Sequence, residues 1–108
     1  MSESDRILVH ENTDAMGLDT MLFQTQEECA ELIKAISKFN RARGIGSPTN
    51  TTEVEAKEKL MLEIADVEIC VQELQYLLRV NLDAIKSAQI QKVHDRLYGG
   101  AKTDVCKV

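Results

Sequence analysis

Aromatic residues are scarce in this chain, and tryptophan is absent. Phe and Tyr make up 4% of the 108 residues, and there is a single proline. A core without large rings must be built from Leu, Ile, Val, Met and Ala. These residues, together with abundant Glu, Lys and Gln, favour helices over sheets. With only five glycines, the composition is not that of a collagen-like or low-complexity chain.

The three cysteines, Cys29, Cys70 and Cys106, offer no disulfide or zinc framework. Their number is odd and no two have CxxC spacing, so we expect free thiols in a reducing cytoplasm. No apolar run approaches the roughly 20 residues that cross a bilayer. The N-terminal segment also lacks the basic and apolar regions of a signal peptide. We therefore predict a cytoplasmic protein without a membrane partner.

Positive charge is in the minority, with 13 Lys and Arg against 18 Asp and Glu and a net charge of -5. Sequence-independent nucleic-acid binding depends on cations that neutralise phosphates, so nucleic acid is not an expected partner. A small phosphorylated ligand remains compatible with the composition, because a bound cation can mask acidic side chains.

Hydrophobic periodicity and capping signals predict four helices and no strands. The first helix is expected to begin after Ser2 and to end at Gly17, and Asp19 is the candidate cap of the second. Thr52 and Glu55 form a capping box at the start of the third helix, and Asn81 is a candidate cap of the last. The expected helices are Glu3–Met16, Asp19 or Thr20 to Ala42, Thr52 to Arg79, and Asn81 to the residue before Gly99.

Four helices in so short a chain suggest an all-α fold, an antiparallel four-helix bundle. We expect one domain over residues 1–108, with a frayed tail at 101–108. A chain this small buries only a modest part of its surface alone, and the third helix is apolar on more than one side. We therefore expect a homodimer or homotetramer that completes the bundle.

Carboxylates occupy unexpected positions in the third helix. Winding it at about 100° per residue places Glu63, Asp66 and Cys70 between two apolar stripes, on the side opposite a polar face. The first stripe contains Leu60, Ile64, Val67, Val71, Leu74 and Leu78, and the second contains Leu62, Ala65, Ile69 and Tyr76.

The second helix repeats this pattern. Glu28 projects inside its apolar arc, Glu31 lies at the edge of the arc, and Glu27 lies further round. The arc contains Met21, Leu22, Cys29, Leu32, Ile33, Ile36 and Phe39. Glu28 and Glu31, like Glu63 and Asp66, are spaced i,i+3 and share a helix face.

Ionised carboxylates in apolar surroundings cost several kcal/mol or become protonated. If the two helices pack antiparallel, the two pairs converge on a site for a hard cation. Carboxylate ligands without His or Cys suit Mg²⁺ or Mn²⁺, and the absence of a Glu-x-x-His pair argues against a di-iron centre. Either pair alone is common on a solvated helix face; both together on apolar sides favour a metal site.

The stretch Gln26 to Leu32 resembles the EExxE motif, and Glu63 to Val67 the ExxD motif, of the MazG-like all-α nucleoside triphosphate pyrophosphohydrolases. The likeness extends over most of Gly17 to Leu78. It implies a small, single-domain MazG-like enzyme that hydrolyses a nucleoside triphosphate to the monophosphate and pyrophosphate, for nucleotide pool cleansing or supply.

The resemblance also implies roles for individual residues. Glu28, Glu31, Glu63 and Asp66 would hold Mg²⁺, and Glu27 would be a further ligand or would orient and deprotonate the attacking water. Phosphate contacts are expected from Lys38, Lys92 and Arg96, each of which could equally be a solvated surface charge. Many relatives carry Lys-x-x-x-Asn-x-x-Arg in the last helix, and Lys92-Val93-His94-Asp95-Arg96 lacks that Asn.

Two other interpretations stay open. The chain could be a catalytically weak helical module that binds nucleotides or metal. It could also be a structural dimerisation partner, in which case Glu63→Ala would leave stability unchanged or raise it, because a buried carboxylate would be lost without losing a ligand.

Overall fold

The computed structural model of the chain describes residues 1–99 and contains four helices and no strands in that range. The all-α prediction is therefore confirmed. The predicted frayed tail at 101–108 lies outside the described residues. The helices are α1 (Glu3–Met16), α2 (Leu18–Ala42), α3 (Glu53–Leu78) and α4 (Asp83–Tyr98).

Two of the predicted helix starts form as expected. The Ser2 hydroxyl accepts from the Asp5 backbone N–H at 3.1 Å. Thr52 and Glu55 form both hydrogen bonds of a capping box at the start of α3. Each satisfies backbone donors that the first helical turn leaves free, which is why local sequence predicts these two boundaries well.

The joint between α1 and α2 differs from the prediction, and Asp19 is not a cap. Gly17 ends α1 and is also the N-cap of α2, which begins at Leu18 without a side-chain cap. Gly17 has φ 83° and ψ 166°, a combination that is essentially restricted to glycine. The chain thus turns in a single residue. Asn81 precedes the N-cap Leu82, yet its side chain accepts from the Asp83 N–H at 2.9 Å.

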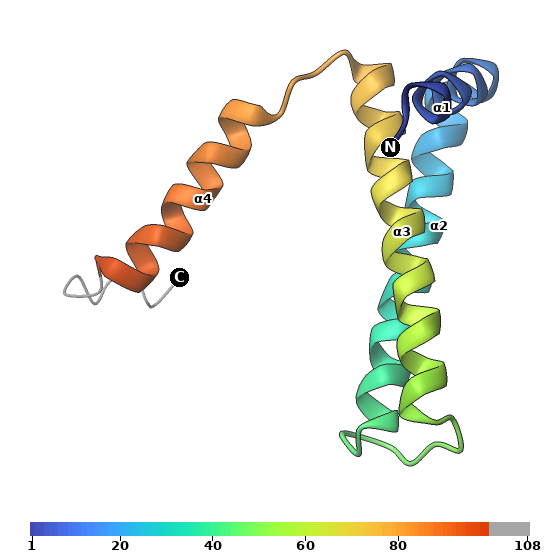
Figure 1. Cartoon of the computed structure of the whole chain (residues 1–108), viewed down its shortest axis with the longest axis vertical. Helices are drawn as coiled ribbons and strands as arrows, with labels where there is room; N and C mark the ends of the chain where they lie inside the picture. Colours follow the sequence, from blue (N-terminus) through green and yellow to red (C-terminus); the bar gives the residue numbers. More distant parts are fainter. Residues whose placement is uncertain (100–108) are drawn as a thin grey trace.

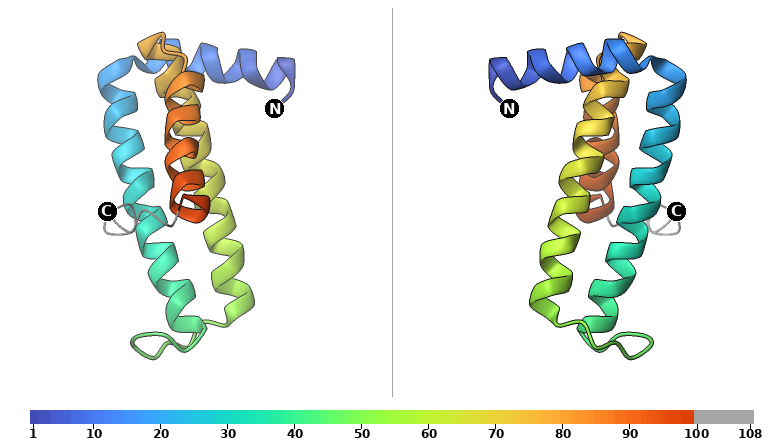
Figure 2. Two further views of the ribbon diagram at one scale, coloured as in Figure 1. Left: turned by 90° about the vertical axis from the view of Figure 1, so that its left-hand side faces the viewer. Right: turned by 90° about the vertical axis from the view of Figure 1, so that its right-hand side faces the viewer.

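An antiparallel hairpin of α2 and α3 forms the body of the molecule, closed by the loop at residues 43–52 (Figures 1 and 2). The inward-facing positions of both helices recur every seven residues, as along a coiled-coil seam. They are Met21, Glu28 and Ala35 in α2, and Ala56, Glu63 and Cys70 in α3. Small alanines near the loop allow close helix approach, and two glutamates occupy the middle of the seam.

Helix α1 lies across the open end of this hairpin (Figure 2). Thr13 is fully buried there, and its hydroxyl lies 2.9 Å from Glu73 Oε2 in α3. The Tyr76 hydroxyl donates to Asp14 at 2.8 Å, and the His10 ring stacks on Tyr76 with 3.9 Å between centroids. Polar contacts therefore hold α1 in place more than apolar burial does.

Helix α4 contacts none of the other three helices and diverges from the hairpin in Figure 1. Within residues 1–99, the chain alone does not complete the predicted four-helix bundle. Its apolar stripes are correspondingly uncovered, with Ile33 67% and Leu62 63% exposed. The buried apolar residues are Met21, Ala35, Ala56 and Cys70.

Among the described residues, none of the helices combines the length and apolarity needed to cross a membrane.

Candidate metal centre

Three carboxylates converge halfway along the α2–α3 seam. One oxygen from each of Glu28, Glu63 and Asp66 lies within 4.8 Å of the other two. Glu63 and Asp66 share a face of α3 because they are one turn apart, and the antiparallel packing places Glu28 of α2 opposite them. Glu63 is buried, Glu28 is half-buried and Asp66 is exposed, so the cluster runs from the seam out to solvent.

Glu63 is the most constrained member of the cluster, with a side chain only 6% exposed. Its Oε1 forms an ion pair with Lys59 Nζ at 2.8 Å. Its Oε2 is buried and has no hydrogen-bond partner among the described residues. A buried carboxylate oxygen without a partner is strongly unfavourable, and a bound cation would remove that cost.

The pKa of Glu28 is raised above its ordinary value of 4.5. Burial is the main cause, followed by the negative charges of Asp66 and Glu63. A hydrogen bond with Asp66 also favours the protonated form, and Glu31 adds a smaller repulsion. The cluster thus accumulates negative charge that the protein alone does not neutralise.

The two other acidic residues expected at the site are not part of this convergence. Glu31 is exposed and forms an ion pair with Lys34 at 3.3 Å, although its charge acts on Glu28. Glu27 is exposed on the same helix. Both lie one turn or less from Glu28, on the solvent side of it.

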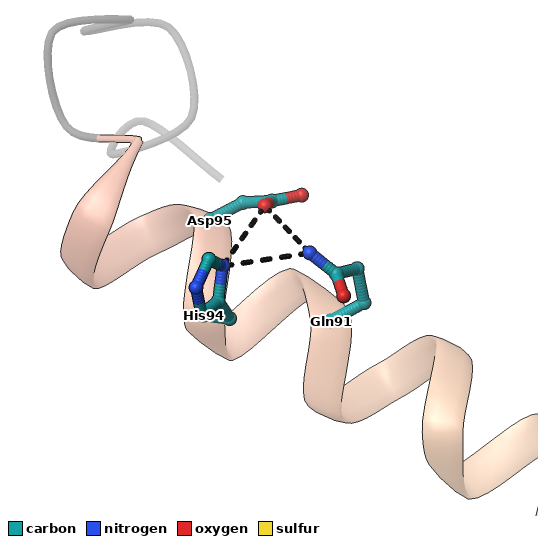
Figure 3. Close-up of polar contacts among 3 residues, drawn as sticks. All are labelled: Gln91, His94 and Asp95. Carbon is teal, nitrogen blue, oxygen red and sulfur yellow. Dashed lines mark hydrogen bonds and ion pairs between the residues drawn. The ribbon is translucent and has the colours of Figure 1, made fainter.

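The expected phosphate-binding cations lie apart from the carboxylates. Lys38 is exposed near the loop end of α2, and Lys92 and Arg96 are exposed on α4, which does not contact α2 or α3. Next to these two cations on α4, Gln91 Nε2 donates to Asp95 Oδ1 at 2.9 Å, and His94 Nδ1 lies 3.4 Å from the same oxygen (Figure 3). This local network joins side chains on one face of α4.

Sequence reasoning missed Lys59 and Glu73. Lys59 precedes Glu63 by four residues, a spacing that allows a contact along a helix. Glu73 is 3% exposed and lies on the same face of α3, ten residues after Glu63. This periodic extension of the Glu63 and Asp66 face is the signal that could have identified it.

A hollow of about 160 Å³ adjoins the carboxylates. Its walls include two members of the cluster and continue along α2 and α3 toward α1. The lining residues are Gln24, Glu28, Asp66, Ile69, Cys70 and Glu73. Burial, followed by the charge of Glu73, raises the pKa of the Cys70 thiol, which keeps it neutral and makes it a poor metal ligand.

The donor set fits a hard divalent cation. Mg²⁺ prefers oxygen ligands and binds proteins through one or a few carboxylates while keeping several waters. Glu28, Glu63 and Asp66 supply such oxygens, and the exposed side at Asp66 leaves room for water and ligand. No thiolate or imidazole joins these carboxylates among residues 1–99.

No family model matches the chain, and neither the curated proteins nor the solved structures contain a significant match to it.

Proposed function

We propose that the protein is a Mg²⁺-dependent hydrolase of the MazG-like type that converts a nucleoside triphosphate to the monophosphate and pyrophosphate. One observation carries the proposal: the buried, unpartnered Oε2 of Glu63, beside the carboxylates of Glu28 and Asp66. A helix seam has no structural need for three converging carboxylates. A cation bound by both these carboxylates and the substrate would account for their convergence, and the EExxE and ExxD patterns agree with this role.

In this proposal Glu28, Glu63 and Asp66 hold the ion, and Glu31 reaches it by leaving Lys34. Bound Mg²⁺, or Mn²⁺ in its place, would offset charge on the triphosphate and lower the pKa of the attacking water. Exposed Glu27 orients that water and accepts its proton. Water attacks the α-phosphorus as the bond to the β-phosphate oxygen breaks, and pyrophosphate leaves.

The proposal includes a second copy of the chain as a partner. The accessible surface is 8223 Å², whereas a folded monomer of this mass exposes about 6,000 Å². The excess exceeds the approximately 800 Å² that each partner buries in a standard interface. Helix α4 turns back toward the loop end of the hairpin but diverges from it and does not contact it (Figure 1). The hairpin of a second copy, packed against this uncovered face, would complete the bundle.

A second copy would also complete the site. Lys59 is the cation that contacts the carboxylate cluster in the described chain. A triphosphate needs further positive charge, since its own charge exceeds that of one divalent ion. Helix α4 of one copy, lying on the hairpin of the other, brings Lys92 and Arg96 toward the substrate. Lys38 of α2 contributes a further positive charge to the phosphates.

The decisive experiment incubates the protein with canonical and non-canonical ribo- and deoxyribonucleoside triphosphates and Mg²⁺, and separates the products by chromatography. We expect nucleoside monophosphate and pyrophosphate, abolished by EDTA. Glu63→Gln should lower the rate by at least about 100-fold. Glu68→Gln, an exposed glutamate of the same helix, is the matched control and should retain the wild-type rate.

The products distinguish the proposal from its alternatives. Diphosphate and orthophosphate would indicate a different phosphoryl chemistry. Metal-dependent nucleotide binding without turnover would favour a binding module. A structural partner would show neither binding nor turnover, and its stability would be indifferent to Mg²⁺.

A further inference from the structure

Glu73 is a buried carboxylate outside the metal cluster, and its position is set from another helix. Its Oε2 lies 2.9 Å from the Thr13 hydroxyl, and Asn12 Nδ2 donates to the same oxygen at 3.3 Å. Both partners are neutral and both belong to α1. The other carboxylate oxygen, Oε1, has no hydrogen bond among residues 1–99, and Glu73 lines the hollow beside the cluster.

The hollow connects this carboxylate to the metal cluster. Asp66 and Glu73 are seven residues apart, which is about 10.5 Å along the axis of α3. Gln24 of α2 lies on the opposite wall, and Ile69 and Cys70 provide apolar surface between the two acidic ends. The volume of 160 Å³ corresponds to roughly five water molecules. A single sugar ring is of this order; a whole nucleoside is larger.

We propose that this hollow is the sugar subsite, in which Glu73 and Gln24 accept hydrogen bonds from the hydroxyl groups of the substrate's pentose. The inference rests on the proposed function. In a nucleotide the sugar follows the α-phosphate directly, so a phosphate held at Asp66 places the sugar in the adjoining space. Carboxylates are common acceptors for ribose hydroxyls.

Asn12 and Thr13 are positioning residues in this arrangement. By occupying Oε2 they fix the side chain of Glu73 beside the hollow that it lines and leave Oε1 available to a ligand. A buried acceptor built to receive a hydroxyl discriminates against an analogue without it, because the acceptor is then left without a partner. The subsite therefore discriminates among sugars.

The test compares one nucleoside triphosphate with its 2′-deoxy and 3′-deoxy analogues, using a base that the wild-type protein hydrolyses. We expect kcat/KM to fall about 10- to 100-fold for at least one analogue, mainly through KM. Glu73→Ala should remove most of that discrimination. This variant leaves no donor stranded, because the Thr13 hydroxyl also lies 2.6 Å from the Val9 carbonyl oxygen.

Thr13→Val is the matched control. It removes the Thr13 contact between α1 and α3 but keeps the carboxylate at the hollow, where Asn12 Nδ2 still donates to Oε2 at 3.3 Å, so most of the sugar discrimination should persist. Calorimetric titration with the corresponding monophosphates and Mg²⁺ gives a readout independent of turnover. The monophosphate of the analogue that is hydrolysed less efficiently should bind the wild type more weakly than the unmodified monophosphate does. This difference in affinity should be smaller in Glu73→Ala.

The outcomes separate the two proposals. Hydrolysis with equal kcat/KM for all three sugars overturns the sugar subsite alone. The sugar subsite is likewise overturned if Glu73→Ala keeps the full sugar discrimination. It is also overturned if Thr13→Val loses as much discrimination as Glu73→Ala, because Glu73 would then serve only to hold α1 against α3. Absence of hydrolysis with every triphosphate overturns the proposed function and the subsite with it.

Discussion

Lys59 is the only cation that the described chain places against the carboxylate cluster, and it neutralises one oxygen of Glu63. The ammonium group lies on the solvent side, more than half exposed, while the carboxylate is buried. The hydrogen bond and negative charge of Glu63 raise the pKa of Lys59, so Lys59 stays charged throughout the physiological range. It thus acts as an internal counter-ion that leaves Oε2 of Glu63 unsatisfied.

Metal binding should therefore stabilise the fold. Ligand that binds only the folded state adds about 2.7 kcal/mol at 100 times its Kd, and we expect Mg²⁺ or Mn²⁺ to raise Tm accordingly in a thermal melt. Glu63→Gln should abolish most of this rise while leaving the metal-free Tm within a few degrees. Glu68→Gln should respond like the wild type. A Tm independent of millimolar metal would count against the site.

Glu28 makes a separate prediction about pH. Its pKa is raised in the folded state, so the folded protein binds this proton more tightly than the unfolded chain. The protonated Glu28 side chain therefore favours the folded state. This stabilisation is complete below the pKa that Glu28 has in the unfolded chain, and it is lost as pH rises through the higher pKa that Glu28 has in the folded protein. Metal-free wild type should lose stability toward neutral pH relative to Glu28→Gln.

Thermal melts in EDTA between pH 4.5 and 7.5 measure this difference. Glu28→Gln should have the higher Tm at pH 7.5, by on the order of a few degrees, and the gap should shrink toward pH 4.5. Excess Mg²⁺ should reverse the order at pH 7.5, since only the wild type keeps the ligand. Parallel Tm curves for the two proteins would refute the raised pKa.

Spacing along each helix predicts much of this site but not all of it. The i,i+3 relation correctly groups Glu63 with Asp66, and antiparallel packing brings Glu28 to them. Periodicity does not determine which way a long side chain turns at the edge of a seam. Glu31 turns to Lys34, and Glu73 is held by α1, a contact between residues 60 positions apart.

Helix boundaries follow from local chemistry, whereas the buried face of a helix depends on its partner. The cap at Thr52 depends only on residues 52–55, and it forms as expected. In α2 the apolar arc suggests a core built on Leu22, Ile33 and Ile36, yet these three are exposed. The hairpin uses a narrower seam, and these apolar side chains of the arc remain exposed in the single chain.

The joint between α1 and α2 is the element most sensitive to a small substitution. A Cβ on Gly17 meets no atom within 4 Å, so the cost of Gly17→Ala is in the backbone, where φ 83° and ψ 166° strain any other residue by about 1–3 kcal/mol. For a domain this size, each 1 kcal/mol lowers Tm by about 4–8 °C.

Asp19→Ala is the control for Gly17→Ala, because Asp19 lies two residues away and does not cap α2. Losing its favourable interaction with the helix dipole costs about 0.3–1 kcal/mol, so its melt should shift less. If Asp19→Ala were the more damaging change, the cap predicted from sequence would be the better description of this joint.

The chain is more extended than a compact domain of its length. Its radius of gyration is 18.0 Å, against about 13 Å for a compact domain of this length. Helix α4 contributes to the difference, because it extends from α3 without packing on the hairpin (Figure 1). Composition and periodicity predicted the helices, but they carry no information on whether α4 packs on its own chain or on another.

The proposed second copy makes the oligomeric state measurable. Light scattering on a sizing column should give at least twice the 12.1 kDa of one chain, and Tm should rise with protein concentration, since association stabilises the folded state by mass action.

Leu62→Glu places a charge on a side chain that is 63% exposed in the single chain. If a partner covers it, an unpaired buried charge results and the assembly should dissociate. Ser37→Glu, at an exposed polar position of α2, should leave the assembly intact. A particle of one chain's mass, with a Tm independent of concentration, would mean that the apolar stripes face water. The lysine and arginine of α4 would then have no route to the carboxylates.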